Sequence, residues 1–206
     1  MYRTGTRLNA GGPPGFRDDA GRDGERAHVP PGQTARVTDP VPTPPAPIDQ
    51  LAAERLWGDY VAASAGTAAI GNEHPAERFG DSTELADELI ELVLHGPKRA
   101  TAGLVADFVA EGQPLPRIGG HWIACDGAGA PRAVLRSVQL RVGPVESVDD
   151  SFAYDEGEGE RTRTDWLRSH RRYFTRVCAA RGEQFSEADE VVFERFRVVW
   201  PPEVRD

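Results

Sequence analysis

Lysine is almost missing from this sequence. Of its 24 basic residues, Lys98 is the only lysine and the rest are arginine. Arginine has a wide, permanently charged guanidinium, whereas lysine is a compact charge whose pKa falls readily on burial, so that it can act as a base. Thr101, three residues on, is a candidate nucleophile or hydrogen-bond partner. A helix end with a favourable cation, followed by a turn at Gly96, explains the stretch equally well.

Cysteine and long apolar runs are also scarce. Cys125 and Cys178 are the only two cysteines, too few for a cysteine-rich metal site, so we expect buried free thiols in a reducing compartment. The histidines have no metal-ligand spacing, and we expect neither metal nor cofactor. No run approaches the roughly 18 apolar residues of a membrane span, and no apolar segment typical of a secretory signal begins the chain. We therefore expect a cytoplasmic protein that does not enter a membrane.

Proline and glycine are concentrated in the first 48 residues. That segment holds 9 of the 17 prolines and 7 of the 22 glycines, a composition typical of disordered sequence. We expect a disordered tail over 1–48 and one folded domain over 49–206, long enough for a substantial core. With 18 basic and 28 acidic residues, that domain has a net charge of −10. Its overall field therefore does not attract nucleic acid, which would need a local basic patch.

Apolar periodicity and turn signals predict the secondary structure. Helices are expected over 48–64, 82–95, 105–111 and 162–181, two of them opened by capping boxes over 81–84 and 162–165. Strands are expected over 99–104, 121–126, 132–142 and 190–200, with a hairpin turn at 127–130 and a bulge near Ser137. Residues 65–78 are expected to be a polar loop, and 145–159 an acidic loop with at most one helical turn. Hairpins and loops join the strands, which indicates an α+β fold with a small curved sheet or barrel.

Two patterns are candidates for chemistry beside Lys98 and Thr101. The spacing of three between those two residues requires a turn or bulge for both to face one cleft, because an odd separation on a strand gives opposite faces. In the run 155–160, carboxylates alternate with glycines just before a helix. Such a run can hold an acid near the lysine, but a solvated acidic loop is the favoured interpretation.

A second pattern is an arginine stripe on the helix expected over 162–181. Arg168, Arg172 and Arg176 recur every four residues, with Arg171 alongside. The stripe can follow phosphates, or be a solvated face paired with acidic residues, and the sequence favours neither.

The order of these elements resembles a known family. It comprises a helix ending at Gly96, a Gly-x-Lys-x-x-Thr unit, the segment 116–119 leading into a strand, an acidic Glu-Gly element before a Trp-bearing helix, and a last strand over 192–199. This order resembles the ASCH domain, a relative of the PUA fold, over roughly residues 50–200.

The resemblance implies a PUA-like small β-barrel flanked by helices, with a cleft lined by the Gly-x-Lys-x-x-Thr unit. Members are thought to bind RNA or nucleotides, and some are hydrolases: one bacterial branch deacetylates acetylated cytidine, and another relative has been described as a ribonuclease. Lys98 and Thr101 match the catalytic Lys and Thr of the deacetylating branch. Glu156, Glu158 and Glu160 all precede the helix, and we assign the family's catalytic Glu to Glu158, whose Glu-Gly pair lies nearest the helix entry.

The implied mechanism has Lys98 accept the hydroxyl proton of Thr101, which attacks the acyl carbon while Glu158 assists proton transfer. In RNA cleavage, Lys98 would instead stabilise phosphate charge, and the arginine stripe would position the strand. Substrate-binding candidates are Arg99, Trp122, Arg168 and Arg172. The alternative is a non-catalytic reader of RNA or a small nucleoside, with Trp122 or Tyr154 stacking on a base. The sequence does not predict the oligomeric state.

Overall fold

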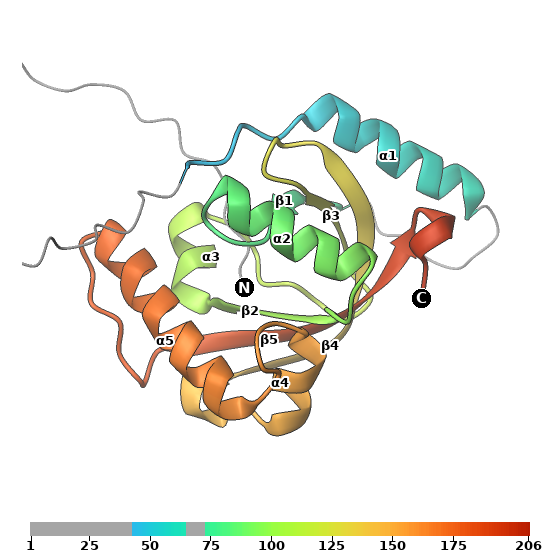
Figure 1. Ribbon diagram of the computed structural model, residues 1–206. Coiled ribbons are helices and arrows are strands. Elements are labelled where there is room, and N and C mark those ends of the chain that lie inside the picture. Colours follow the sequence, from blue (N-terminus) through green and yellow to red (C-terminus); the bar gives the residue numbers. More distant parts are fainter. Residues whose placement is uncertain (1–42, 65–72) are drawn as a thin grey trace, which may run out of the picture. The chain divides into compact units, whose positions relative to one another are not determined.

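The computed structural model describes residues 43–64 and 73–206, which form a five-stranded sheet with helices packed on both faces (Figure 1). The strands are β1 (Ala76–Arg78), β2 (Ala100–Leu104), β3 (His121–Cys125), β4 (Pro131–Pro144) and β5 (Glu190–Trp200). The helices are α1 (Gln50–Ala63), α2 (Thr83–Leu94), α3 (Val105–Glu111), α4 (Asp150–Glu156) and α5 (Arg163–Ala180). Within these ranges no helix combines the length and apolarity needed to cross a membrane.

The strand order β1-β3-β4-β5-β2 gives an open sheet. β1 pairs with β3 in parallel, and the other neighbours are antiparallel. In the described part of the chain β1 and β2 are the two edges and do not pair with each other, so the expected closed barrel is not observed. The expected α+β class is confirmed, because antiparallel pairing dominates the sheet and the helices pack against its faces.

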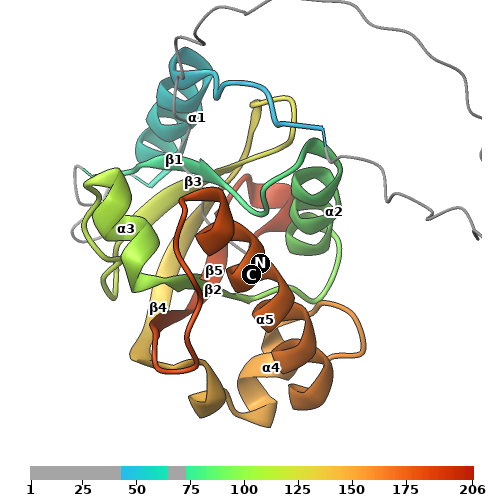
Figure 2. The ribbon, with the colours of Figure 1, turned by 90° about the vertical axis from the view of Figure 1, so that its left-hand side faces the viewer.

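Three apolar clusters fill the space between sheet and helices, because side chains alternate between the faces of each strand. The first lies between α4, α5 and the β2–β5 pair, and includes Ala100, Phe152 and Phe193. The second lies under α2, and the third lies between α1 and β3–β4. Figure 2 shows α4 beside α5 on one side of the molecule and α1 at its far end. The two faces of β2 therefore have different surroundings.

Most predicted elements are confirmed to within two or three residues. Thr162 accepts a hydrogen bond from the third backbone N–H of α5, as its capping box predicts. In α2 the cap is Ser82, one residue after the Asp81 that begins the predicted box. The β4–β5 register shifts at Ser137, which confirms the expected bulge. Two elements differ: residues 76–78 form β1 instead of a loop, and residues 150–156 form the two-turn helix α4.

The segment 43–48, assigned to the tail by composition, lies against the domain. The backbone N–H of Ala46 donates to the Gly127 carbonyl at 3.0 Å, and Thr83 donates to Thr43 at 2.9 Å. The buried Arg78 guanidinium donates to the Ala46 carbonyl at 2.5 Å. The folded part therefore includes these residues, and the remainder of the expected 1–48 tail lies outside the described residues.

A histidine is enclosed at the edge of the third cluster. His121, at the start of β3, is buried, and its Nε2 lies 3.1 Å from the Tyr60 hydroxyl of α1. The Trp57 ring packs on it edge-on, with centroids 5.5 Å apart. Burial, aided by the charge of Arg136, lowers the pKa of His121 to about 4. The α1–β3 contact is thus built around a neutral imidazole.

Two helices end on glycines with the same backbone conformation but different surroundings. Gly112 ends α3 with φ 67°, and Gly157 ends α4 with φ 73°. A Cβ on Gly157 would lie 2.7 Å from the backbone nitrogen of Lys98, whereas a Cβ on Gly112 would have no atom within 4 Å. The end of α4 therefore packs directly on the turn that contains Lys98.

We predict that Gly157→Ala lowers the free energy of unfolding by more than Gly112→Ala. Both substitutions place a side chain in the left-handed region, which costs about 1–2 kcal/mol, but only Gly157→Ala also forces Lys98 away. Urea denaturation of the two variants measures the difference. Equal losses would contradict the close approach of α4 to Lys98.

We also predict that stability falls as the pH is lowered from about 6.5 to about 4, partly through His121. Its pKa is lower in the folded state than its ordinary value of 6.5, so the unfolded chain binds more protons across this window and unfolding is favoured. His121→Gln should reduce the dependence of the unfolding free energy on pH there. The exposed His95, replaced by Gln, is the control; an unchanged slope in His121→Gln would refute the assignment.

Candidate functional site

Lys98 lies on the turn between α2 and β2 and is completely buried, with 0% of its side chain exposed. Its Nζ donates to Glu158 Oε1 at 2.5 Å and to the Ala100 carbonyl at 3.0 Å. The Phe79 ring lies beneath the ammonium, with 5.2 Å between Nζ and the ring centroid. A buried charge is costly unless it is paired, and here a carboxylate, a carbonyl and an aromatic face surround it. The simple helix-end interpretation, which places the cation in solvent, does not fit this burial.

A second carboxylate, Glu156, is also fully buried near Lys98. Its Oε1 lies 3.9 Å from Lys98 Nζ, and its Oε2 accepts the indole N–H of Trp166 and lies 3.3 Å from His170 Nε2. Burial acts to raise the pKa of Glu156, but the positive charges of His170 and Lys98 help to hold that pKa below its ordinary value. Burial lowers the pKa of His170, against the attraction of Glu156.

The three glutamates before α5 therefore differ in their exposure to solvent and in their distance from Lys98. Glu156 is 0% exposed and Glu158 is 17% exposed, both facing Lys98, whereas Glu160 is exposed at the surface. The favoured interpretation of a solvated acidic loop is wrong for Glu156 and Glu158. The α4 helix causes the difference, because its last residue and the following turn point inward and Gly157 brings them onto the Lys98 backbone.

Thr101 lies on the other side of β2 from Ala100 and Ala102. Those two alanines belong to the first cluster, so Thr101 and Gly103 face the opposite side, toward Phe108 and Glu194. Lys98, on the turn before the strand, contacts Phe79 of the second cluster. It also lies near Glu156, which binds Trp166 of the first cluster, so Lys98 sits between the two sides of the sheet.

A small pocket opens at Thr101. It is lined by Thr101, Ala102, Gly103, Phe108, Val192 and Glu194. Its cavity volume is about 10 Å³, the space of about one water molecule and far below the range for whole drug-sized ligands, so it admits at most one small group of a ligand. The Thr101 Oγ1 is buried and has no hydrogen-bond partner among residues 43–64 and 73–206. Lys98 does not line this pocket and does not hydrogen-bond Thr101 in the described structure.

Glu194 was not predicted and is the acidic wall of that pocket. It pairs with Thr101 across the β2–β5 ladder, and its Oε1 accepts from Trp122 Nε1 at 3.1 Å and from Ser137 Oγ at 2.5 Å. The sequence signal that could have identified Glu194 was its charge at an inward-facing position of a largely apolar strand. The pocket thus pairs a hydroxyl with a fixed carboxylate.

Two predicted substrate-binding residues have other partners. Trp122 is 1% exposed inside the second cluster, with its ring 5.2 Å from Phe79, so it offers no face on which a base can stack. The guanidinium of Arg99 donates to the carbonyls of Val93 and Lys98 and to the Asp206 carboxylate. Arg99 therefore stabilises the turn that contains Lys98 and lies next to the site, not in it.

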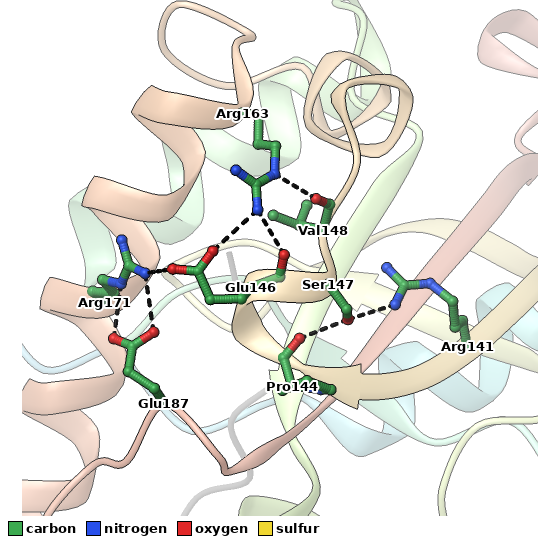
Figure 3. A network of polar contacts seen from close by, with 8 residues as sticks. All are labelled: Arg141, Pro144, Glu146, Ser147, Val148, Arg163, Arg171 and Glu187. Atoms are coloured by element: carbon green, nitrogen blue, oxygen red, sulfur yellow. Dashed lines mark hydrogen bonds and ion pairs between the residues drawn. The ribbon is translucent and has the colours of Figure 1, made fainter.

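The arginine stripe is largely engaged in ion pairs. Arg168 pairs with Asp165, Arg176 with Asp81 at 2.8 Å, and Arg171 with both Glu146 and Glu187. Figure 3 shows Arg171 and Arg163 meeting on Glu146, which ties the segment before α4 to α5. Arg172 is exposed. Of the two alternatives left open by sequence, a face paired with acidic residues describes the stripe better than a free phosphate track.

His170 and Trp166 are site residues that sequence reasoning placed elsewhere. Their four-residue spacing puts them on one face of α5, where the rings stack with centroids 3.5 Å apart. The sequence signal was that spacing directly after the acidic run, but scattered histidines were assessed only as metal ligands. Across residues 43–64 and 73–206, no cluster of three or more His, Cys, Asp or Glu side chains is arranged to hold a metal ion.

Two solved structures are similar to this fold. An ASCH domain from Lactobacillus crispatus JV V101 aligns with a TM-score of 0.64 and 23% identity, covering 75% of this chain and 97% of that one. A protein from Enterococcus faecalis V583 aligns with a TM-score of 0.64 and 28% identity, covering 72% and 88%. Among curated proteins, no match was found.

The family comparison matches residues 76–200 to the ASCH domain. This range is more than half of the chain, and it runs from β1 to the end of β5, so it includes Lys98, Thr101, both buried glutamates and the pocket. The expected resemblance is confirmed, and the fold is of the PUA-like type. The chain belongs to the ASCH domain family.

Proposed function

We propose that this ASCH domain binds RNA or a modified nucleoside at the Lys98 site and hydrolyses an acyl–nitrogen bond there, as in acetylated cytidine. Its family and structural matches support a domain of a general RNA-binding type. The observation that carries the hydrolytic step is the buried Lys98 ammonium 2.5 Å from Glu158, three residues before Thr101, which lines a pocket.

The pocket favours an acyl group over a phosphodiester as the reacting centre. Glu194 presents a buried carboxylate beside Thr101, and a phosphate entering there would meet a like charge. The ion-paired arginine stripe offers little free charge to hold an RNA strand. A neutral amide meets neither obstacle, because its N–H can donate to the Glu194 carboxylate and its carbonyl oxygen can accept from the Thr101 hydroxyl.

In the proposed reaction, Lys98 first transfers a proton to Glu158, whose partly exposed carboxyl exchanges it with water. The neutral amine then accepts the Thr101 hydroxyl proton, directly or through one water, because catalytic hydrogen bonds often form only with substrate bound. Thr101 Oγ1 attacks the acyl carbon, the C–N bond breaks, and Lys98 returns the proton to the leaving nitrogen. Water then hydrolyses the Thr101 ester, releasing the acid.

The alternative is a non-catalytic reader of RNA or a nucleoside. One observation favours it: Tyr154 of α4 is exposed, and the Arg161 guanidinium lies 3.7 Å from its ring centroid. A base stacking on this pair would bind beside the acidic turn. This surface needs neither Thr101 nor proton transfer by Lys98.

We predict that the purified full chain converts N4-acetylcytidine to cytidine and acetate, measured by liquid chromatography. Thr101→Val removes only the hydroxyl, and Lys98→Met and Glu158→Gln remove the two proton-transfer groups. Each should lower kcat/KM by about 10²–10⁴-fold, the usual contribution of such groups. Glu160→Gln, a matched change on the exposed surface of the same turn, should leave turnover unaltered.

Single-stranded RNA, incubated in parallel, separates the alternatives. If the unaltered protein cleaves the RNA and leaves acetylcytidine intact, and Lys98→Met produces no RNA fragments, the reaction is RNA cleavage and not deacylation. Salt-sensitive binding without turnover of either substrate, weakened by Tyr154→Ala and not by Thr101→Val, would establish the reader and rule out the enzyme.

A further inference from the structure

Glu156 connects Lys98 to a buried histidine that the proposed reaction does not use. One carboxylate oxygen lies 3.9 Å from Lys98 Nζ, and the other lies 3.3 Å from His170 Nε2. Lys98, Glu156 and His170 are all at most 2% exposed. Three ionisable groups in contact away from water titrate together, because a charge on one changes the cost of a charge on the next.

The partners of His170 fix where its protons lie. Nδ1 is 2.9 Å from the Trp166 carbonyl oxygen, and a carbonyl can only accept, so we assign a proton to Nδ1. If Nε2 were then bare, its lone pair would face a carboxylate oxygen that already accepts from the Trp166 indole. Burial alone lowers the pKa of His170, but the 3.3 Å approach to Glu156 opposes that effect. A second proton between His170 Nε2 and Glu156 Oε2 removes the repulsion, whether it resides on the ring or on the carboxyl.

The charges around the pair support this second proton. Lys98 is positive and Glu158 negative, and they are the charged side chains that face the pair from the turn before β2 and from the turn after α4. The Trp166 and Phe174 rings pack on the remaining sides of the imidazole. With one shared proton on His170 and Glu156, the buried cluster is neutral. Without that proton it has one uncompensated negative charge, which burial disfavours.

We propose that His170 and Glu156 hold a shared buried proton that controls how readily Lys98 loses its own proton, so that His170 is a positioning residue of the Lys98 site. With the proton in place, the charge of Glu156 is offset and Glu158 is the one uncompensated carboxylate that faces Lys98. Loss of the proton would leave two carboxylates facing Lys98, and the ammonium would become harder to deprotonate.

The role in turnover rests on the proposed function, because only a reaction that needs neutral Lys98 benefits from this control. The proton linkage itself is a property of the free protein. It can therefore be measured without any substrate.

Lys98 gives this measurement an unusual advantage, because it is the chain's only lysine. Protein labelled with 13C-lysine gives one side-chain signal set, and the Cε shift follows the charge of Lys98 as the pH is varied. His170→Gln should move the midpoint of this titration up by about one to three pH units, the usual effect of an unopposed neighbouring carboxylate. Glu156→Gln should move it down.

The double variant separates linkage from loosened packing. If His170 acts through Glu156, His170→Gln has no further effect on the midpoint once Glu156 is Gln. A structural role would move the midpoint equally in both backgrounds, and that result would overturn the proposal, as would an unchanged midpoint in His170→Gln. His95→Gln, at an exposed histidine, is the control.

A second measurement uses the unaltered chain, in case a variant fails to fold. The 15N shifts of the His170 ring should show a protonated Nδ1 and an Nε2 that shares a proton, both changing at a pH where the Lys98 Cε signal also moves. A bare Nε2 at neutral pH, or titration of His170 that leaves Lys98 unmoved, would refute the linkage. Absent turnover of acetylcytidine with the linkage intact would instead refute only the proposed function.

Discussion

The cost of burying one ammonium organises the centre of this protein. Lys98 is removed from water, and an isolated charge there would be far too unfavourable to persist. The chain meets that cost with groups from three places: Glu158 after α4, the Ala100 carbonyl at the start of β2, and the face of Phe79 before α2. Each of these must be held in place, and much of the surrounding structure holds them.

Polar contacts around α4 hold the glutamates of the site in position. The Arg99 N–H donates to the Asp155 carbonyl at 2.8 Å, which joins the lysine turn to the helix end. Arg163 and Arg171 of α5 meet on Glu146 just before α4 (Figure 3). These surface pairs add little stability individually. Together they fix the segment from which both buried glutamates enter the site.

The sequence predicted an element well when the interactions that form the element lie within a few residues of it. Caps at Ser82 and Thr162 act within one helical turn, and their helices were predicted closely. The three-residue β1 exists through its pairing with β3, some 45 residues away, which no local pattern signals. The α4 helix was missed because a short acidic segment with a glycine end looks like a loop.

In the candidate site too, some residues were identified from the sequence, and features that depend on distant segments were not. Lys98 and Glu158 were singled out by composition and by family resemblance, and the structure brings them into contact. The burial of Trp122 was not foreseen, because an indole has both an apolar ring and an N–H donor and suits a core or a surface. Arginine spacing on α5 was read correctly, but its acidic partners, such as Asp81, come from distant segments.

The contacts of residues 43–63 have a consequence for where this domain begins. They lie before the matched range 76–200, yet Ala46 and Asp49 hydrogen-bond to the 127–129 hairpin turn and α1 covers Ile123 and Val134. A relative without this stretch would need another element to cover the same apolar face of β3 and β4. The range matched to the family is therefore smaller than the packed unit that residues 43–63 form with the rest of the domain.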